Sequence, residues 1–214
     1  MIYEKEFQAY GYNDIVGYSG KHITDEMIDS CMTINKKFYA KDFVFDDSIK
    51  DIVKKYNQMC FVFQDKSDNS IMGYSFWFPI KTKVFNAFIQ NNQTLQEFRD
   101  SFFSSYKEES VNLFLASEAY VLGYDIKELH KAIEDVFQKR ILDLAYNGII
   151  VKYIAMESRC KFDEQFLVKN LGLTLKDKKE KSTFYYDKYS PYTIYSDSKF
   201  ASGLYQYYKK KQDS

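Results

Sequence analysis

The carboxylate of Glu118 is the side chain in this sequence best suited to acid–base chemistry. It lies within VNLFLASEAYVLG (111–123), a largely apolar run that predicts a strand. Burial disfavours the charged form of a carboxylate and raises its pKa, which allows it to accept a proton near neutral pH. Two structural interpretations stay open: a glutamate at the sheet surface, or one paired with a lysine. Tyr185 and Tyr186 are weaker candidates for a general acid.

The cysteines and histidines predict neither a nucleophile nor a metal centre. Cys31, Cys60 and Cys160 are widely spaced and odd in number, which is typical of reduced, mostly buried thiols. With only His22 and His130, and no CxxC or HxxxH motif, the sequence predicts no structural zinc site. No histidine stands in a recognisable partner motif for Cys160, so we interpret this residue as an inert thiol.

Length and charge set the class of protein. A chain of 214 residues fits one domain with a core large enough to fold without disulfides. Its 30 basic and 30 acidic residues balance, which gives no support for a nucleic-acid partner. No apolar run approaches the roughly 20 residues of a membrane span. The first residues show no signal-peptide core. We therefore expect a cytoplasmic protein without membrane attachment.

The elements around Glu118 follow a definite order. They are the hairpin CFVFQDKSDNSIMGYSFWF (60–78), the strand 111–123, the amphipathic helix 126–147 and the strand IIVKYIAMES (149–158). Asp125 is suited to cap the helix and Gly148 to end it. A helix between two apolar strands implies a right-handed crossover, so these two strands should run parallel.

The flanking segments are less regular. Predicted elements are a helix after the N-cap Thr24, a second helix at 48–57, a short helix at 162–172, and a closing hairpin of 173–175 and 182–189. Residues 1–22 are turn-rich, with at most one short strand. Pro79 is expected to end the second strand of the first hairpin. Residues 80–110 form an insertion with a helix expected at 93–106.

This order of elements resembles the Gcn5-related N-acetyltransferase (GNAT) family. The resemblance covers roughly residues 23–189. It implies an α/β fold of the acyl-CoA N-acyltransferase type, with a mixed, mainly antiparallel sheet flanked by helices. The domain would span 1–189 with the insertion at about 80–110, and 190–214 would form a tyrosine-rich C-terminal extension. It also implies acetyl-CoA as co-substrate and no metal.

The resemblance assigns roles to residues of the central strand and the helix after it. Glu118 would deprotonate an ammonium acceptor, directly or through water. Tyr120 is expected to face the helices, away from Glu118. Backbone groups of the strand end would contact the pantetheine arm and thioester, and amides at the helix start would bind the pyrophosphate. The residues concerned are Ala119, Tyr120 and Val121 on the strand, and Ile126, Lys127, Glu128 and Leu129 on the helix.

The sequence departs from the family pattern at two places. The pyrophosphate turn is degenerate: Gly123 comes early, the turn is about two residues short, and Asp125 and Glu128 place negative charge beside the phosphate position. In the last predicted helix, Cys160 occupies the position of the family's usual asparagine, and Val168 that of its usual tyrosine acid.

Two functions follow from the resemblance and these departures. The first is an N-acetyltransferase that moves an acetyl group from acetyl-CoA to an amine of a small molecule or protein. The alternative is a catalytically silent domain of this type that binds a ligand or a protein partner. Its aromatic-rich insertion and tail would then form an interaction surface. Packing of the tail on a neighbour would make the protein a homodimer.

Overall fold

A computed structural model describes residues 7–8, 15–39, 48–91, 102–106, 109–121, 126–158, 174–178 and 183–188. The chain forms two compact units. The first combines Met1–Phe78 with Ala116–Asp143, and the second combines Pro79–Leu115 with Leu144–Ser214.

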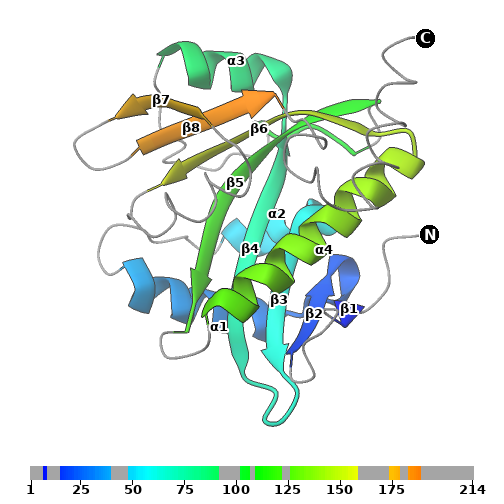
Figure 1. Ribbon diagram of the computed structural model, residues 1–214, viewed down its shortest axis with the longest axis vertical. Coiled ribbons are helices and arrows are strands. Elements are labelled where there is room, and N and C mark those ends of the chain that lie inside the picture. Colours follow the sequence, from blue (N-terminus) through cyan, green and yellow to red (C-terminus); the bar gives the residue numbers. More distant parts are fainter. Residues whose placement is uncertain are drawn as a thin grey trace. The chain divides into compact units, whose positions relative to one another are not determined.

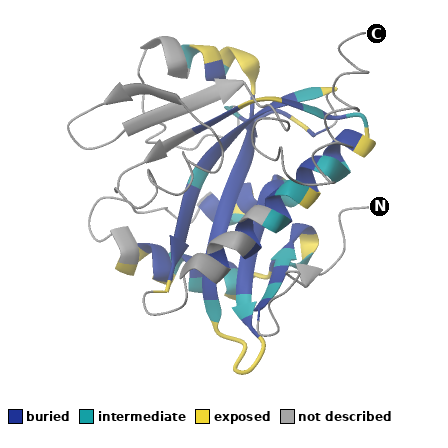
Figure 2. Ribbon diagram, in the orientation of Figure 1, coloured by how far each residue is buried: buried dark blue, intermediate teal, exposed yellow. Residues whose placement is uncertain are grey.

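Antiparallel strands form the centre of the first unit (Figure 1). They are β1 (Phe7–Gln8), β2 (Ile15–Ser19), β3 (Cys60–Asp65) and β4 (Ile71–Ile80), hydrogen-bonded in that order. The end of β5 (Ser110–Tyr120) follows β4 in the same order. The two run in opposite directions, since Val121 N–H bonds to Met72 and Ser75 bonds to Glu118. Most residues of β3 and β4 are buried, so both faces of these strands are covered (Figure 2).

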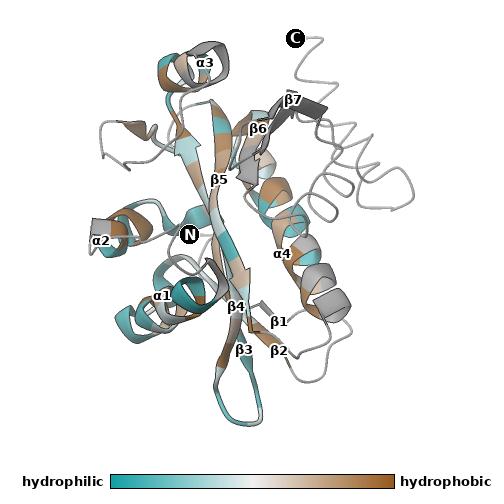
Figure 3. Ribbon diagram, turned by 90° about the vertical axis from the view of Figure 1, so that its left-hand side faces the viewer, coloured by the Kyte–Doolittle hydropathy of each residue, from teal (hydrophilic) through white to brown (hydrophobic). Residues whose placement is uncertain are grey.

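Helices cover the two faces of these strands. Helices α1 (Asp25–Tyr39) and α2 (Ser48–Lys55) lie on one side of β3 and β4, and α4 (Ile126–Tyr146) lies on the other (Figure 3). Met27 N–H donates to Thr24 Oγ1 at 3.3 Å, which confirms the predicted N-cap of α1. As predicted from its spacing, α2 buries one apolar face made of Ile49, Ile52, Val53 and Tyr56.

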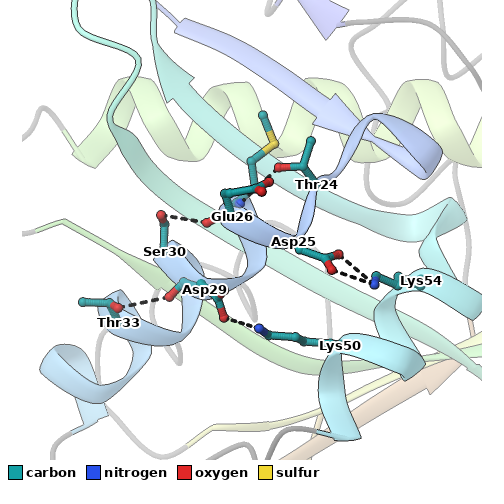
Figure 4. Close-up of polar contacts among 9 residues, drawn as sticks. Thr24, Asp25, Glu26, Asp29, Ser30, Thr33, Lys50 and Lys54 are labelled. Atoms are coloured by element: carbon teal, nitrogen blue, oxygen red, sulfur yellow. Dashed lines mark hydrogen bonds and ion pairs between the residues drawn. The ribbon is translucent and has the colours of Figure 1, made fainter.

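Two ion pairs join α1 and α2 at the surface (Figure 4). Lys50 Nζ lies 2.5 Å from Asp29 Oδ1, and Lys54 Nζ lies 2.8 Å from Asp25 Oδ1. The order of partners is reversed between the helices, so α1 and α2 run antiparallel. Exposed pairs of this kind stabilise a fold by only about 1 kcal/mol or less, and they mainly set the register of the two helices.

The second unit contains the parallel strand pair. The first residues of β5 run parallel to β6 (Ile150–Ser158), in register from Ser110↔Ile150 to Leu115↔Met156. The strand β8 (Thr183–Lys188) lies antiparallel to β6, and β7 (Thr174–Lys178) antiparallel to β8. This confirms the predicted mixed, mainly antiparallel sheet, the parallel pair and the closing hairpin.

The end of α4 also agrees with the sequence. Gly148 has φ +81°, a left-handed conformation that glycine adopts without strain. The N–H groups of Asn147 and Ile149 donate to Leu144 O, and Gly148 N–H donates to Ala145 O. The carbonyls of Leu144 and Ala145 in the last turn are therefore hydrogen-bonded, and the chain continues into β6.

Several predicted elements need correction. Residues 15–19 form a full strand that pairs with β3 from Ile15↔Asp65 to Ser19↔Phe61, and a second strand precedes it. Pro79 does not end β4, which continues to Ile80. A helix that the sequence did not predict, α3 (Thr82–Asn91), follows β4.

The helix expected at 93–106 is wrong for the part of this segment that is described. Phe103 forms an antiparallel bridge with Ile80, and Ser104 N–H donates to Pro79 O at 2.9 Å. Residues 92–101, the predicted helix at 162–172 and the tail from 190 lie outside the described residues.

The thiols behave as the sequence predicts. Cys31 and Cys60 are free and buried, and burial raises the pKa of both well above the ordinary range. Cys160 lies outside the described residues. No helix in the described part of the chain is long and apolar enough to cross a membrane.

Candidate active site

Glu118 lies in a buried hydrogen-bond network on β5. Only 2% of the residue is exposed. The Ser75 hydroxyl on β4 donates to Glu118 Oε2 at 2.7 Å, and the Tyr120 hydroxyl donates to Oε1 at 2.5 Å. Both carboxylate oxygens therefore have a hydroxyl donor, as a buried carboxylate requires. Glu118 is buried, so the interpretation of a glutamate at the sheet surface is wrong.

The network extends along β4 to a tryptophan that packs on α4. Trp77 Nε1–H donates to Ser75 Oγ at 2.9 Å. The Trp77 ring lies 4.8 Å from the Phe137 ring, centroid to centroid. Because alternate residues of a strand point to opposite faces, Ser75 and Trp77 share the α4 face of the sheet. Glu118 lies on this face as well.

The expected separation of Tyr120 from Glu118 is wrong, although Tyr120 does face a helix. Residues two positions apart on a strand point to the same face, so Tyr120 lies beside Glu118. Both side chains face α4, and Tyr120 is 2% exposed. The sequence already contained this signal in the spacing of the two residues.

Gly73 lets the beginning of α4 pack closely on the sheet. A Cβ atom at this position would lie 3.0 Å from Leu129 Cδ2 and 3.0 Å from the backbone oxygen of Ala119. Leu129 itself is fully buried. Its side chain therefore belongs to the core, and only its backbone is suited to bind an anion. The side chains of Ile126, Lys127 and Glu128, and the loop 122–125, lie outside the described residues.

The backbone amides at the end of β5 divide between two edges. Val121 N–H donates to Met72 O at 2.8 Å, so this N–H is already hydrogen-bonded within the sheet. N–H directions alternate along an extended strand, so Ala119 N–H also points to β4. Tyr120 N–H points to the opposite edge of β5.

No protein-family model and no curated protein matches the chain. Solved structures match with low sequence identity. FdhC, a nucleotide-linked sugar GNAT, has a TM-score of 0.54 at 11% identity, covering 94% of this chain and 98% of FdhC. FeeM, an N-acyl amino acid synthase from uncultured soil microbes, also reaches 0.54 at 11%, with coverage of 88% and 97%. The NatC complex bound to Gag peptide and CoA reaches 0.53 at 9%, with coverage of 81% and 96%.

The chain has the Gcn5-related N-acetyltransferase fold. This confirms the fold predicted from the order of elements, although at such identities the likeness concerns the fold alone. Within the acetyltransferase fold, β5 is the strand that carries Glu118, and α4 is the helix that begins shortly after it.

A second polar network, which the sequence analysis missed, lies on the other face of β4 and β5. Asn35 Nδ2 of α1 donates to Tyr74 Oη at 2.6 Å and to Ser117 Oγ at 3.0 Å, and the two hydroxyls lie 2.8 Å apart. Burial raises the pKa of Tyr74 far above its ordinary value, although its hydrogen bonds to Ser117 and Asn35 act in the opposite direction. Tyr74 therefore stays neutral and is unsuited to release a proton.

The weaker acid candidates of the sequence analysis lie in the second unit. Tyr185 and Tyr186 belong to β8 and are in register with Met156 and Ala155 of β6. Their side chains are outside the described residues. Glu118 is the only carboxylate in the described end of β5.

Proposed function

We propose that this protein is an acyl-CoA-dependent N-acyltransferase that moves an acetyl group from acetyl-CoA to an amine. The observation that carries the proposal is the position of Glu118: a buried carboxylate, held by two hydroxyls, near the end of β5 in this fold. The neighbouring structures support the general class, and one of them is described with CoA bound. The acceptor is a small-molecule or protein amine, and the protein works in the cytoplasm.

Residues of the first unit supply what the reaction needs. Glu118 accepts a proton from the ammonium form of the acceptor. The neutral amine then attacks the carbonyl carbon of the thioester, a carbon–nitrogen bond forms while the carbon–sulfur bond breaks, and the second proton of the amine goes to the CoA thiolate that leaves. Tyr120 N–H, on the edge of β5 away from β4, is placed to donate to the pantetheine arm or the thioester carbonyl. Amides of Ile126–Leu129, in the first turn of α4, would bind the pyrophosphate.

Isothermal titration of the purified chain with acetyl-CoA tests the proposal. Binding in the low micromolar range is expected, because the strand edge and the helix start hold the two ends of the ligand. The matched variant Glu128→Lys removes negative charge from the first turn of α4 and should tighten binding. Release of free CoA with spermidine, lysine and an alanyl peptide as acceptors would then show turnover.

Particular contacts also support a second candidate, a catalytically silent domain of the same fold. Both oxygens of Glu118 already accept hydrogen bonds, and the N–H of Val121 is used by Met72. A silent domain predicts no acetyl-CoA binding at millimolar concentration by the wild type or by Glu128→Lys. Binding gained only in the variant would show a phosphate site lost to negative charge, which again favours the silent domain.

A further inference from the structure

We propose that Ser75 and Tyr120 are positioning residues that hold the Glu118 carboxylate ionised and in one orientation, ready to accept a proton. The role in catalysis rests on the proposed N-acyltransfer. The orientation of the carboxylate rests on hydrogen bonds within the first unit. The inference gives the side chains of Ser75, Tyr120 and Trp77 a role around the carboxylate that the sequence predicted.

The direction of the hydrogen bonds on β4 is fixed by chemistry. The indole N–H of Trp77 has no acceptor capacity, so it must donate to Ser75 Oγ. Ser75 then has its own hydroxyl proton left, and Glu118 Oε2 lies 2.7 Å away to receive it. The packing of Trp77 on Phe137 of α4 holds the indole in place. The chain of donors therefore ends on the carboxylate.

Tyr120 completes the arrangement from the same strand. Its hydroxyl donates to Glu118 Oε1 at 2.5 Å, a short distance typical of a hydrogen bond to an ionised oxygen. An ionised carboxylate offers about four lone-pair positions, and these two donors occupy two of them. Two donated hydrogen bonds favour the charged form of Glu118, whereas burial opposes it.

The described side chains of α4 that pack on the sheet are mostly apolar. The face of α4 toward the sheet carries Leu129, Ala132, Ile133, Val136 and Phe137, which are apolar and buried. Arg140, the buried charge in the described part of α4, donates to Ser19 Oγ and lies 3.4 Å from Asp143. The charge of Glu118 also raises the pKa of Tyr74, which lies on the opposite face of the sheet.

The pH dependence of turnover tests the inference. In Ser75→Ala one donor to the carboxylate is lost, so the acid limb of the kcat/KM profile should move up by about one pH unit. Rates on that limb should then fall about tenfold. Ser75→Thr keeps the hydroxyl and should restore the wild-type limb, and Tyr120→Phe should produce a shift of the same sign. One acceptor amine is used throughout, so that its own titration cancels between variants.

Ser117→Ala is the matched control. Ser117 is the neighbour of Glu118 on β5, is 6% exposed and is hydrogen-bonded, but it belongs to the network on the opposite face. Its loss should lower stability as much as Ser75→Ala while leaving the acid limb unchanged. The inference would be overturned if the acid limb of the kcat/KM profile had the same midpoint in wild type, Ser75→Ala and Tyr120→Phe. A shift of this midpoint in Ser117→Ala as large as that in Ser75→Ala would also overturn it.

A titration that needs no turnover separates this inference from the proposed function. The carboxyl ¹³C resonance of Glu118, assigned with Glu118→Gln, should titrate at higher pH in Ser75→Ala than in wild type. An unchanged midpoint would overturn the positioning role even in an active enzyme. Absence of acetyl-CoA binding with a shifted midpoint would refute the acyltransferase and leave the role of Ser75 in holding the carboxylate supported.

Discussion

The Tyr120 hydroxyl donates to Oε1 of Glu118 at 2.5 Å, from two residues further along the same strand. This i, i+2 relationship pairs a donor and an acceptor on one strand face without help from any other element. Ser75, on the neighbouring strand, supplies the second donor. The carboxylate is thus fixed by strand geometry.

Replacing Glu118 by glutamine should remove the proton acceptor while conserving size. We expect kcat to fall by roughly 10²–10⁴-fold, the usual contribution of a general base. The Kd for acetyl-CoA should stay near the wild-type value, because the amides of β5 and α4 are untouched. Initial rates of CoA release together with calorimetric Kd values measure the two effects separately. Full turnover in Glu118→Gln would eliminate this residue as the base.

Replacing Tyr74 by phenylalanine should affect stability and leave chemistry unchanged. The variant removes the hydroxyl that bonds to Asn35 and Ser117, and should lower the free energy of unfolding by about 1–3 kcal/mol. Because Tyr74 points away from α4, kcat and its pH profile should not move. Urea denaturation and the CoA-release assay measure both. Tyr120→Phe should in addition move the acid limb of the kcat/KM profile, and an equal shift in Tyr74→Phe would contradict the separation into two faces.

Much of the fold follows from the sequence because its strongest signals are local. The apolar period of 126–147 and the glycine after it predict α4 to within a residue of its observed end at Tyr146. The two apolar strands that flank this helix predict their own parallel pairing. The strand Ile15–Ser19 was harder to predict, since it is short and contains Gly17.

The site was less predictable because its contacts depend on register. The sequence identifies Glu118 as a carboxylate in an apolar strand. The periodicity of the two strands does not predict that Ser75 of β4 lies beside Glu118. It also does not predict that Met72 O accepts the hydrogen bond from Val121 N–H. Such contacts are set by how β4 and β5 align, and a shift of one residue would exchange the faces of every side chain. Only the Tyr120 pairing was available from spacing alone.

Stability should fall as the solution becomes alkaline. Burial raises the pKa of the Cys31 and Cys60 thiols and of the Tyr74 hydroxyl, so these groups stay protonated in the fold. In the unfolded chain they ionise near their ordinary values of about 8.5 and 10. Above those values the unfolded state binds fewer protons, and stability decreases by about 1.4 kcal/mol per pH unit for each group.

Urea midpoints between pH 7.5 and 10.5 measure this dependence. The stability contribution of each group is present below its unfolded pKa and is lost as pH rises toward its folded pKa. Cys60→Ala should reduce the slope from about pH 8.5 upward, and Tyr74→Phe only above about pH 10. A free energy of unfolding that stays constant from pH 8 to 10.5 in the wild type would contradict the assignment.

Gly73→Ala should destabilise the protein, because the added methyl group meets Leu129 Cδ2 and the Ala119 carbonyl at 3.0 Å. The carbonyl belongs to strand backbone and has little room to move, so a cost of about 1–3 kcal/mol is expected.

Urea denaturation of Gly73→Ala, Leu129→Ala and the double variant separates the two contacts. Relief of the side-chain clash in the double variant should make its loss smaller than the sum of the single losses. Gly148→Ala is the control: no atom lies within 4 Å of its Cβ position, so its cost arises from the positive φ alone. Additive losses for Gly73 and Leu129 would mean that α4 does not pack on β4 at this glycine.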